Sequence, residues 1–428
     1  MLTYRSFFLS FTAQVFSAGA SLLLNVMIAR MLGVSGTGLF FQGMMIAGIG
    51  SAVARLGMDN VITRFISVYF SENDFDNMVR VVRTGLKAGC AVTFVLFFLY
   101  ATVSLLTPFS SFQFMVLSIP FLTFSAIYSS ALRGIGKAVL FTLIQRGFVP
   151  TVFILLLLVH NVLQQEMIPE KSFQLYFVAS LLVAIFSWAL WRFFLSGRDS
   201  NSAKHFSSDH FTWTTLWQGG VQHTYVVSLL NLAVFPWAGI FFLGIFSSPE
   251  QVGLYGVAWR LATQLSLILI ASGNVAAPEF AKLHAQGKIR QLEAAIRKTS
   301  LTVLLVSAVS ACIMIGAHRE ILALFGKKFI TASGVFFIIL TGHIIRSSAG
   351  NTGMLLMMTG HEREVKKTLL ISSSVLICCT ILLSWIWGAP GAAWANTIAL
   401  SVQSGCLIYY CIAILHVTPL PYWKYISP

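Results

Sequence analysis

Long apolar segments alternate with short polar connections along the whole of this sequence. A helix that crosses the hydrocarbon core of a membrane needs about 20 mainly apolar residues, and the apolar segments are of about that length. We expect spans at residues 6–29, 38–58, 82–106, 112–132, 138–160, 172–194, 213–243, 251–276, 296–316, 330–357, 367–387 and 391–416. The pattern predicts an all-α membrane protein with about twelve transmembrane helices.

One polar stretch divides these spans into two sets. Residues 197–211 (GRDSNSAKHFSSDHF) are the longest polar connection, with six expected spans on each side. We therefore expect an N-terminal six-helix lobe at residues 1–196, a cytoplasmic linker at 197–211 and a C-terminal six-helix lobe at 212–428.

A weak internal repeat favours the same division. Matching positions 215 residues apart are Gly38-Leu39-Phe40 with Gly253-Leu254-Tyr255, Phe65 with Phe280, Arg83 with Lys298, and Thr84 with Thr299. Positions 224 apart are Leu132 with Leu356, Gly136 with Gly360, and Lys137 with His361. Six spans separate the copies, so both copies have the same orientation, and transporters commonly place a substrate path between such repeats. Chance similarity between apolar segments is the alternative.

Composition agrees with a membrane protein. Of the 428 residues, 57% are hydrophobic and 10% are charged, whereas soluble domains carry about 25% charged residues. The net charge of +14 could indicate a nucleic-acid partner, but the basic residues form no patch or stripe. Lys and Arg are concentrated in one alternate set of connections, which places both termini in the cytoplasm. We expect no nucleic-acid partner.

The remaining composition excludes several kinds of chemistry. The six cysteines lie inside apolar segments without a CxxC spacing, so small buried side chains are expected rather than a metal or redox site. No phosphate-binding GxxxxGK[ST] loop occurs, which excludes ATP-driven transport by that motif. We expect no metal, no cofactor and no catalytic residue.

Several segments resemble one family of transporters. "LLNVMIARMLGVSGTGLFFQGMMIAGIGSAVARLGMDNVITRFIS", "ALRGIGK", "VGLYGVAWRLATQLSLILIASGNVAAPEFAKL" and "ILALFGKKFITASGVFFIIL" occur in this order. In order and spacing they resemble the polysaccharide transporter family of the multidrug, oligosaccharidyl-lipid and polysaccharide exporter superfamily. The resemblance covers nearly the whole chain.

The resemblance implies a fold, a location and a cargo. Two six-helix lobes would surround a central cavity and work by alternating access in the bacterial cytoplasmic (inner) membrane. The implied cargo is a polyprenyl-diphosphate-linked oligosaccharide, such as an O-antigen unit for lipopolysaccharide. Membrane lipids and a polysaccharide polymerase are the other implied partners.

Basic residues inside the expected spans are the candidate cargo-binding residues. An Arg at the centre of a spanning helix costs about 2.5–3.5 kcal/mol on insertion scales, so it normally faces water or a partner. The candidates are Arg260, Arg346, Arg146, Arg55, Arg64 and His343. They could form a ladder of cations for a moving diphosphate, because Arg binds phosphate oxygens in a bidentate manner without losing its proton.

Each candidate also has a structural interpretation. Arg55 could pair with Asp59 at i+4, Arg64 could extend to the interface, and Arg146 could cap carbonyl groups of a neighbouring helix. His343 could be a satisfied polar residue between helices. Arg55 and Arg64 can face one cavity only if Gly57 bends their helix, because nine residues place them on opposite sides of a straight one.

Two other functions compete with a flippase for lipid-linked oligosaccharides. The first is a multidrug exporter, for which the interior has few of the membrane carboxylates that cation coupling often uses. The second is a membrane polymerase or ligase acting on the same lipid, for which the external loops are short and their glutamates form no evident acid/base pair. The flippase is the function that the sequence favours, and the protein is not expected to be an enzyme.

Overall fold

The computed structural model describes residues 4–106, 109–163, 166–196 and 222–419. Throughout these four ranges every regular element is helical, as the apolar pattern predicts. In this part of the chain, eleven helices are long and apolar enough to cross a membrane. The protein is therefore a multi-pass, all-α membrane protein.

The first of these helices accounts for two of the expected spans. Helix α1 (Tyr4–Ala54) has a kink at Gly33, whose φ of 67° and ψ of −171° are not helical. Its apolar part, Thr12–Ala54, has 43 residues, and each arm beside Gly33 is about 30 Å long at the rise of an α-helix. Since 30 Å is the thickness of the hydrocarbon core, each arm is as long as one span. Counting both arms confirms the prediction of about twelve spans.

Contacts divide the chain into two compact units, Met1–Leu32 with Leu39–Trp237, and Gly33–Gly38 with Ala238–Pro428. The border at Trp237 lies within the expected span 213–243, whereas the expected linker, 197–211, lies outside the described residues. The division into lobes at that linker stays a prediction.

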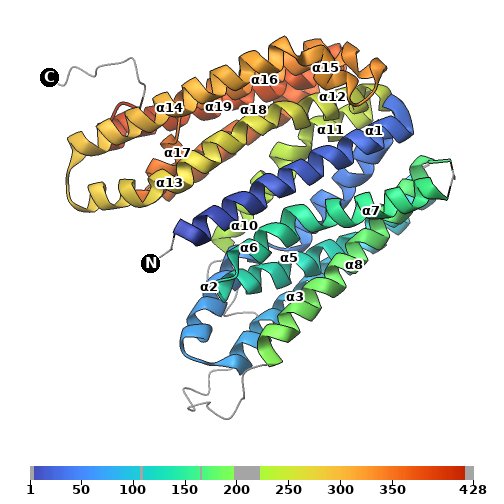
Figure 1. Ribbon diagram of the computed structural model, residues 1–428, viewed down its shortest axis with the longest axis horizontal. Coiled ribbons are helices and arrows are strands. Elements are labelled where there is room, and N and C mark those ends of the chain that lie inside the picture. Colours follow the sequence, from blue (N-terminus) through green and yellow to red (C-terminus); the bar gives the residue numbers. More distant parts are fainter. Residues whose placement is uncertain (1–3, 107–108, 164–165, 197–221, 420–428) are drawn as a thin grey trace. The chain divides into compact units, whose positions relative to one another are not determined.

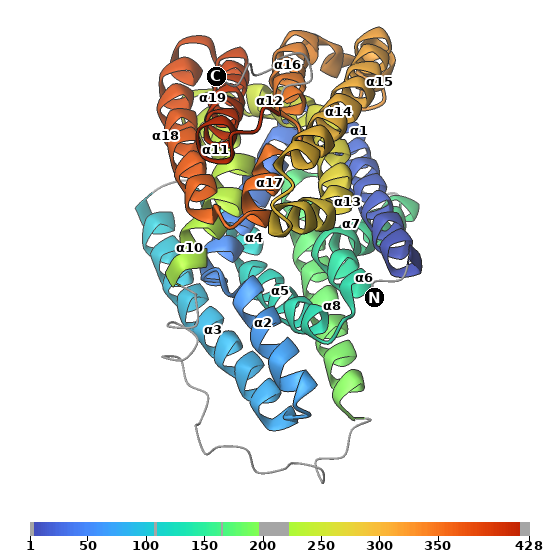
Figure 2. The same ribbon diagram turned by 90° about the vertical axis from the view of Figure 1, so that its left-hand side faces the viewer.

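The first unit is built around α5, which packs against α2, α3 and α8 (Figure 2). After α1, its elements are α2 (Met58–Ser71), α3 (Phe75–Leu106), η1 (Phe109–Phe112), α4 (Gln113–Leu117), α5 (Ile119–Gly134), α6 (Ala138–Thr142), η2 (Leu143–Phe148), α7 (Val149–Val162), α8 (Pro169–Ser196), α10 (Gln222–Leu229) and η5 (Leu230–Val234). Helix α11 (Phe235–Phe246) begins in this unit and ends in the second.

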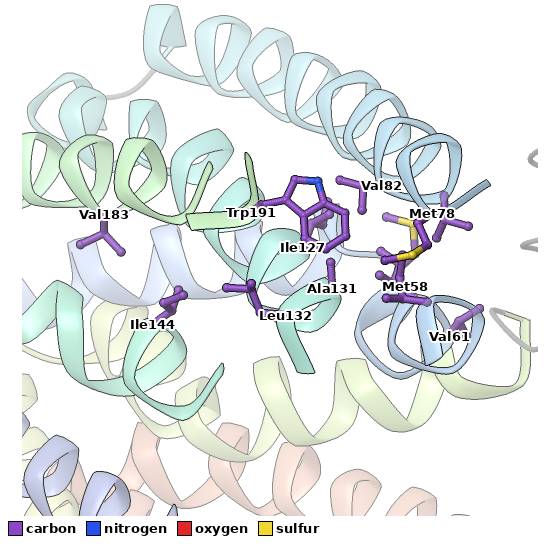
Figure 3. Close-up of a cluster of buried hydrophobic side chains, with 13 residues drawn as sticks. Met58, Val61, Met78, Val82, Ile127, Ala131, Leu132, Ile144, Val183 and Trp191 are labelled. Carbon is purple, nitrogen blue, oxygen red and sulfur yellow. The ribbon is translucent and has the colours of Figure 1, made fainter. Parts of the chain in front are cut away.

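A hydrophobic cluster holds the inner helices of the first unit together. Figure 3 shows Trp191 of α8, Met58 of α2, Met78 of α3 and Ile127 of α5 in this cluster. All four side chains are at most 3% exposed. In contrast, α3 exposes Phe94 and other large apolar side chains, as expected of a helix whose outer face contacts lipid rather than water.

The second unit contains two pairs of long neighbouring helices (Figure 1). One pair is α18 with α19, and the other is α13 with α14. Its elements after α11 are α12 (Pro249–Ala262), η6 (Thr263–Leu265), α13 (Ser266–Ala285), α14 (Ile289–Gly316), α15 (His318–Ala323), η7 (Lys327–Ala332), α16 (Ser333–Ala349), α17 (Thr352–Met358), α18 (Glu362–Trp387) and α19 (Ala389–Leu415).

The internal repeat appears in the backbone of two turns. Gly136 after α5 has a φ of 81°, and its repeat partner Gly360 after α17 has a φ of 83°. In the first turn, the amide of Lys137 donates to the carbonyl of Leu132 (3.0 Å) and that of Gly136 to the carbonyl of Arg133 (3.0 Å). In the second turn, the amide of His361 donates to the carbonyl of Leu356 (2.9 Å) and that of Gly360 to the carbonyl of Met357 (3.4 Å). This is the Schellman arrangement, which favours glycine because the left-handed residue carries no Cβ. The two halves thus end equivalent helices in the same way.

Two spans contain a π-helical turn just before a proline. The segment η2 precedes Pro150 in α7, and η5 precedes Pro236 in α11. Proline cannot donate the hydrogen bond that an α-helix requires and its ring crowds the preceding turn. A wider turn at the same place accommodates this defect without ending the span.

Candidate functional site

Helix α16 carries two of the predicted cargo-binding residues on one face. His343 and Arg346 are three residues apart, so they lie one above the other on the helix. Both belong to the apolar span Lys327–Ser348. Helix α16 packs against α12, α14 and α19, so its polar face has to find partners on those neighbours or on α13.

Arg346 bonds to a neutral side chain. One of its terminal guanidinium nitrogens (Nη1) donates a hydrogen bond of 2.9 Å to Oε1 of Gln403 on α19. Gln403 is only 6% exposed, and Arg346 is partly buried. A glutamine satisfies the geometry of one N–H group but leaves the positive charge of the guanidinium uncompensated.

His343 bonds to a hydroxyl group on a different helix. Its Nδ1 lies 3.1 Å from Oγ of Ser266, the first residue of α13, and the side chain is 5% exposed. When Ser266 donates this bond, the proton of the neutral imidazole resides on Nε2. Nε2 is buried and has no hydrogen-bond partner among the described residues, so the site contains one donor that is not used internally.

A further polar pair involves Asn351, which lies between α16 and α17. Nδ2 of Asn351 donates a 2.9 Å hydrogen bond to Oγ of Ser272 on α13. We call these three pairs of the second unit together the polar seam. The polar seam consists of Ser266 with His343, Arg346 with Gln403, and Ser272 with Asn351.

Arg260 lies at a change in helix geometry. It is partly exposed near the end of α12, and the short 3₁₀ segment η6 follows it. Its backbone carbonyl accepts hydrogen bonds from Thr263 Oγ1 and Gln264 Nε2, both 3.1 Å long. Helix α12 packs against α16 and α19, the two helices that carry Arg346 and Gln403.

Arg55 is paired with an acid in the first unit. The helix breaks at Leu56 and Gly57, which have φ values of 50° and 69°, so the bend at Gly57 that one shared cavity for Arg55 and Arg64 would require is present. Across this break Nη1 of Arg55 lies 3.6 Å from Oδ2 of Asp59. The structural interpretation of Arg55 is thus present in the protein, and a role in binding cargo stays a prediction.

The remaining two candidates are exposed. The guanidinium of Arg64 lies 5.7 Å from the centre of the Phe65 ring. Arg146 lies in the π-helical segment η2. The ladder of cations across the membrane therefore stays a prediction.

Three polar partners were not predicted. Gln403 and Ser266 lie 57 and 77 residues from the side chains they bond, and only the presence of polar residues in apolar spans could have indicated them. Arg133, the third, donates hydrogen bonds to Thr63 Oγ1 at 3.0 Å and to the carbonyl of Asp59 at 3.2 Å. It therefore links α5 to α2 near the ion pair of Arg55.

These observations define a multi-pass helical membrane protein with polar pairs inside its spans. The chain belongs to the polysaccharide biosynthesis protein family, whose model matches residues 3–284. This match confirms the family that the sequence resembles.

A curated relative and two solved structures are similar over most of the chain. The probable low-salt glycan biosynthesis flippase Agl15 of Haloferax volcanii is 22% identical over 419 residues, which cover 95% of this chain and 83% of that protein. The lipid II flippase MurJ in an inward closed conformation aligns with a TM-score of 0.73 and 13% identity over 93% of this chain and 86% of that chain. An inward-facing multidrug resistance transporter of the MATE family and MOP superfamily aligns with a TM-score of 0.70 and 12% identity, over 92% of this chain and 98% of that chain. At such identities the structural likeness shows the fold alone.

Proposed function

We propose that the protein is a flippase for polyprenyl-diphosphate-linked oligosaccharides, such as O-antigen units. It moves them from the cytoplasmic to the periplasmic leaflet of a bacterial cytoplasmic membrane, with both termini in the cytoplasm. The family match and the flippase relative support this proposal. Alternating access between two six-helix lobes around a central cavity is the proposed mechanism, and a polysaccharide polymerase is the proposed recipient of the flipped units.

The proposal rests mainly on the surroundings of Arg346. A partly buried guanidinium inside an apolar span is costly unless it meets a partner or an anion. Arg346 has a neutral partner, Gln403, so its charge is available to a ligand. Diphosphate oxygens match the planar donor geometry of arginine better than neutral drugs do.

His343 extends the same site by one helical turn. Its Nε2 has no partner among the described residues, and with Ser266 as donor to Nδ1 it offers an N–H group. Such a group suits a phosphate or sugar oxygen. In this proposal Arg346 supplies charge, and His343 supplies a neutral hydrogen bond that helps to orient the headgroup.

Export of multidrug substrates is the second candidate, because the MATE-family structure shares the fold. The two candidates differ in cargo, since drug exporters would not require a diphosphate. Asp59, in the first turn of α2, would be the candidate coupling group for such an exporter, but here it already pairs with Arg55.

Proteoliposomes distinguish these functions. The purified protein is reconstituted with a fluorescent polyprenyl-diphosphate oligosaccharide, and the fraction accessible to a membrane-impermeant quencher is followed over time. We expect wild-type protein to equilibrate the lipid across the leaflets. Arg346→Ala should slow this at least about tenfold, because hydrogen bonds to charged groups contribute about 1.5–3 kcal/mol. The exposed Arg64→Ala is the matched control and should have a smaller effect.

The same assay includes outcomes that contradict the proposal. Equal rates for wild-type and protein-free liposomes would argue against flipping of this lipid. Uptake of cationic dyes by the same proteoliposomes, without movement of the lipid, would favour drug export. Unchanged flipping by Arg346→Ala would remove Arg346 from the site.

A further inference from the structure

We infer that Gln403 is a positioning residue, which fixes Arg346 for an anionic headgroup while leaving its charge uncompensated. The inference rests on the proposed function, since it concerns the same cargo. Its starting point is the 2.9 Å hydrogen bond from Arg346 Nη1 to Gln403 Oε1, which joins α16 to α19.

The two helices hold this pair at a fixed separation. A Cβ added to Gly342 of α16 would lie 2.9 Å from the Cα of Thr397 on α19, so the backbones approach closely there. The hydroxyl of Thr397 also donates a 2.7 Å hydrogen bond to the carbonyl of Ile338. Small residues and side-chain hydrogen bonds of this kind bring membrane helices close together. Gln403, six residues beyond Thr397, is therefore presented to Arg346 from a rigid support.

The chemical identity of the partner determines what the site can bind. A carboxylate at the same position would form an ion pair and compete with an incoming phosphate. The amide accepts one hydrogen bond but carries no charge. Arg346 also takes part in neither of the ion pairs found among the described residues, which join Arg55 to Asp59 and Arg297 to Glu293. Gln403 thus orders the guanidinium and keeps it attractive to anions.

Burial explains why this arrangement is specific. Gln403 is 6% exposed, so water does not replace its amide easily, and an unpaired guanidinium N–H at this depth would be unfavourable. A flexible arginine would lose rotamer freedom when cargo binds, and this loss would weaken binding. Gln403 already orders the side chain of Arg346 before cargo arrives. A pre-ordered donor group lowers that cost.

The test measures binding of farnesyl diphosphate to the purified full chain in nanodiscs, with farnesol as the probe that lacks phosphate. Gln403→Glu should weaken farnesyl diphosphate binding at least about tenfold, because the new carboxylate neutralises Arg346. Gln403→Met should weaken it less, about threefold, because the charge stays while its position is lost. The Tm of Gln403→Glu should equal or exceed that of wild type while binding falls, and a purely structural role would not give this combination.

A second glutamine in the same unit is the matched control. Gln251 accepts a 2.8 Å hydrogen bond from the backbone amide of Ala389, at the start of α19. Gln251→Glu introduces the same charge where the positive end of the helix dipole favours it. It should leave binding of farnesyl diphosphate unchanged.

Double variants show whether Gln403 acts through Arg346. In an Arg346→Ala background, the neutral change Gln403→Met should not weaken binding further, because coupled residues are not additive. Additive losses would overturn the inference, and so would wild-type binding by Gln403→Glu. If Gln403→Glu does not fold, binding by Gln403→Met, by Arg346→Ala and by their double variant still tests whether the two losses are additive.

The proposed function and this inference fail in different ways. Equal binding of farnesol and farnesyl diphosphate by wild-type protein, or wild-type affinity in Arg346→Ala, would contradict the diphosphate site itself. A loss of affinity in Arg346→Ala with none in Gln403→Glu would contradict only the role of Gln403.

Discussion

Gly38 and Gly253, equivalent residues of the internal repeat, contact each other reciprocally. A Cβ on Gly38 would overlap the carbonyl of Pro249, and a Cβ on Gly253 would overlap the carbonyl of Val34. Val34 and Pro249 are separated by the same 215 residues as the two glycines. Each glycine thus meets the same position of the other copy of the repeat, and all four residues belong to the second unit.

This contact leaves no room for a side chain. We expect Gly253→Val to lower the Tm in detergent by several degrees, because backbone atoms, which cannot move aside easily, occupy the space. Gly253→Ala should lower it less. The helical Gly405 of α19 has nothing within 4 Å of an added Cβ, so Gly405→Ala is the control and should keep or raise the Tm. A wild-type Tm for Gly253→Val would show that the two backbones can separate without cost.

The topology can be tested by reporter fusions at described turns. We expect fusions after Asn161 and Gly388 to be periplasmic, and fusions after Gly136 and Gly287 to be cytoplasmic. The physical reason is the concentration of Lys and Arg in the connections on one side. Alkaline phosphatase activity reports the periplasmic sites, and green fluorescent protein reports the cytoplasmic sites. An inverted pattern at two of these four positions would refute the predicted orientation.

Two amides can separate the roles of the His343 nitrogens. Glutamine places an N–H group near the position of Nε2, whereas asparagine places its amide near Nδ1. If Nε2–H donates to cargo, His343→Gln should retain most flipping, and His343→Asn should keep the Ser266 contact but lose flipping about tenfold. Flipping rates in proteoliposomes, at equal protein amount, give the comparison. Equal loss in both variants would instead favour a protonation role that only imidazole can fulfil.

The spans were predictable because lipid imposes one rule along the chain. Each must be apolar for about 20 residues, so hydropathy places it within a few residues. The ends were less predictable. Helix α3 starts at Phe75 rather than 82, and α13 continues to Ala285 rather than 276. These extensions carry charged residues, and the turns beside them contain left-handed residues such as Asn73 and Gly287.

The candidate site was predictable only in part. Arg346 and His343 stand out as polar residues in an apolar span, which is a local property. Their partners Gln403 and Ser266 depend on which helices lie beside α16, and the spacing of residues along one helix contains no such information. The pairing of Arg55 with Asp59 was foreseeable because they are four residues apart, although the helix breaks between them.

Arg260 provides a test of the proposed cargo site that is independent of Gln403. It lies on α12, a helix that packs against both α16 and α19. If Arg260 helps to hold the diphosphate, Arg260→Ala should abolish flipping at a normal protein level. Arg260→Lys should restore it only in part, because lysine keeps the charge but loses the bidentate donor geometry. Arg64→Ala should reduce flipping less, since Arg64 is exposed, and Coulomb attraction is weaker where the dielectric constant is high.

If Arg260 instead only fastens α12 to its neighbours, both Arg260 variants should lose protein from the membrane while activity per molecule survives. Lipid-linked oligosaccharide in each leaflet, normalised to protein amount, separates these outcomes, and full activity per molecule in Arg260→Ala would exclude the diphosphate role.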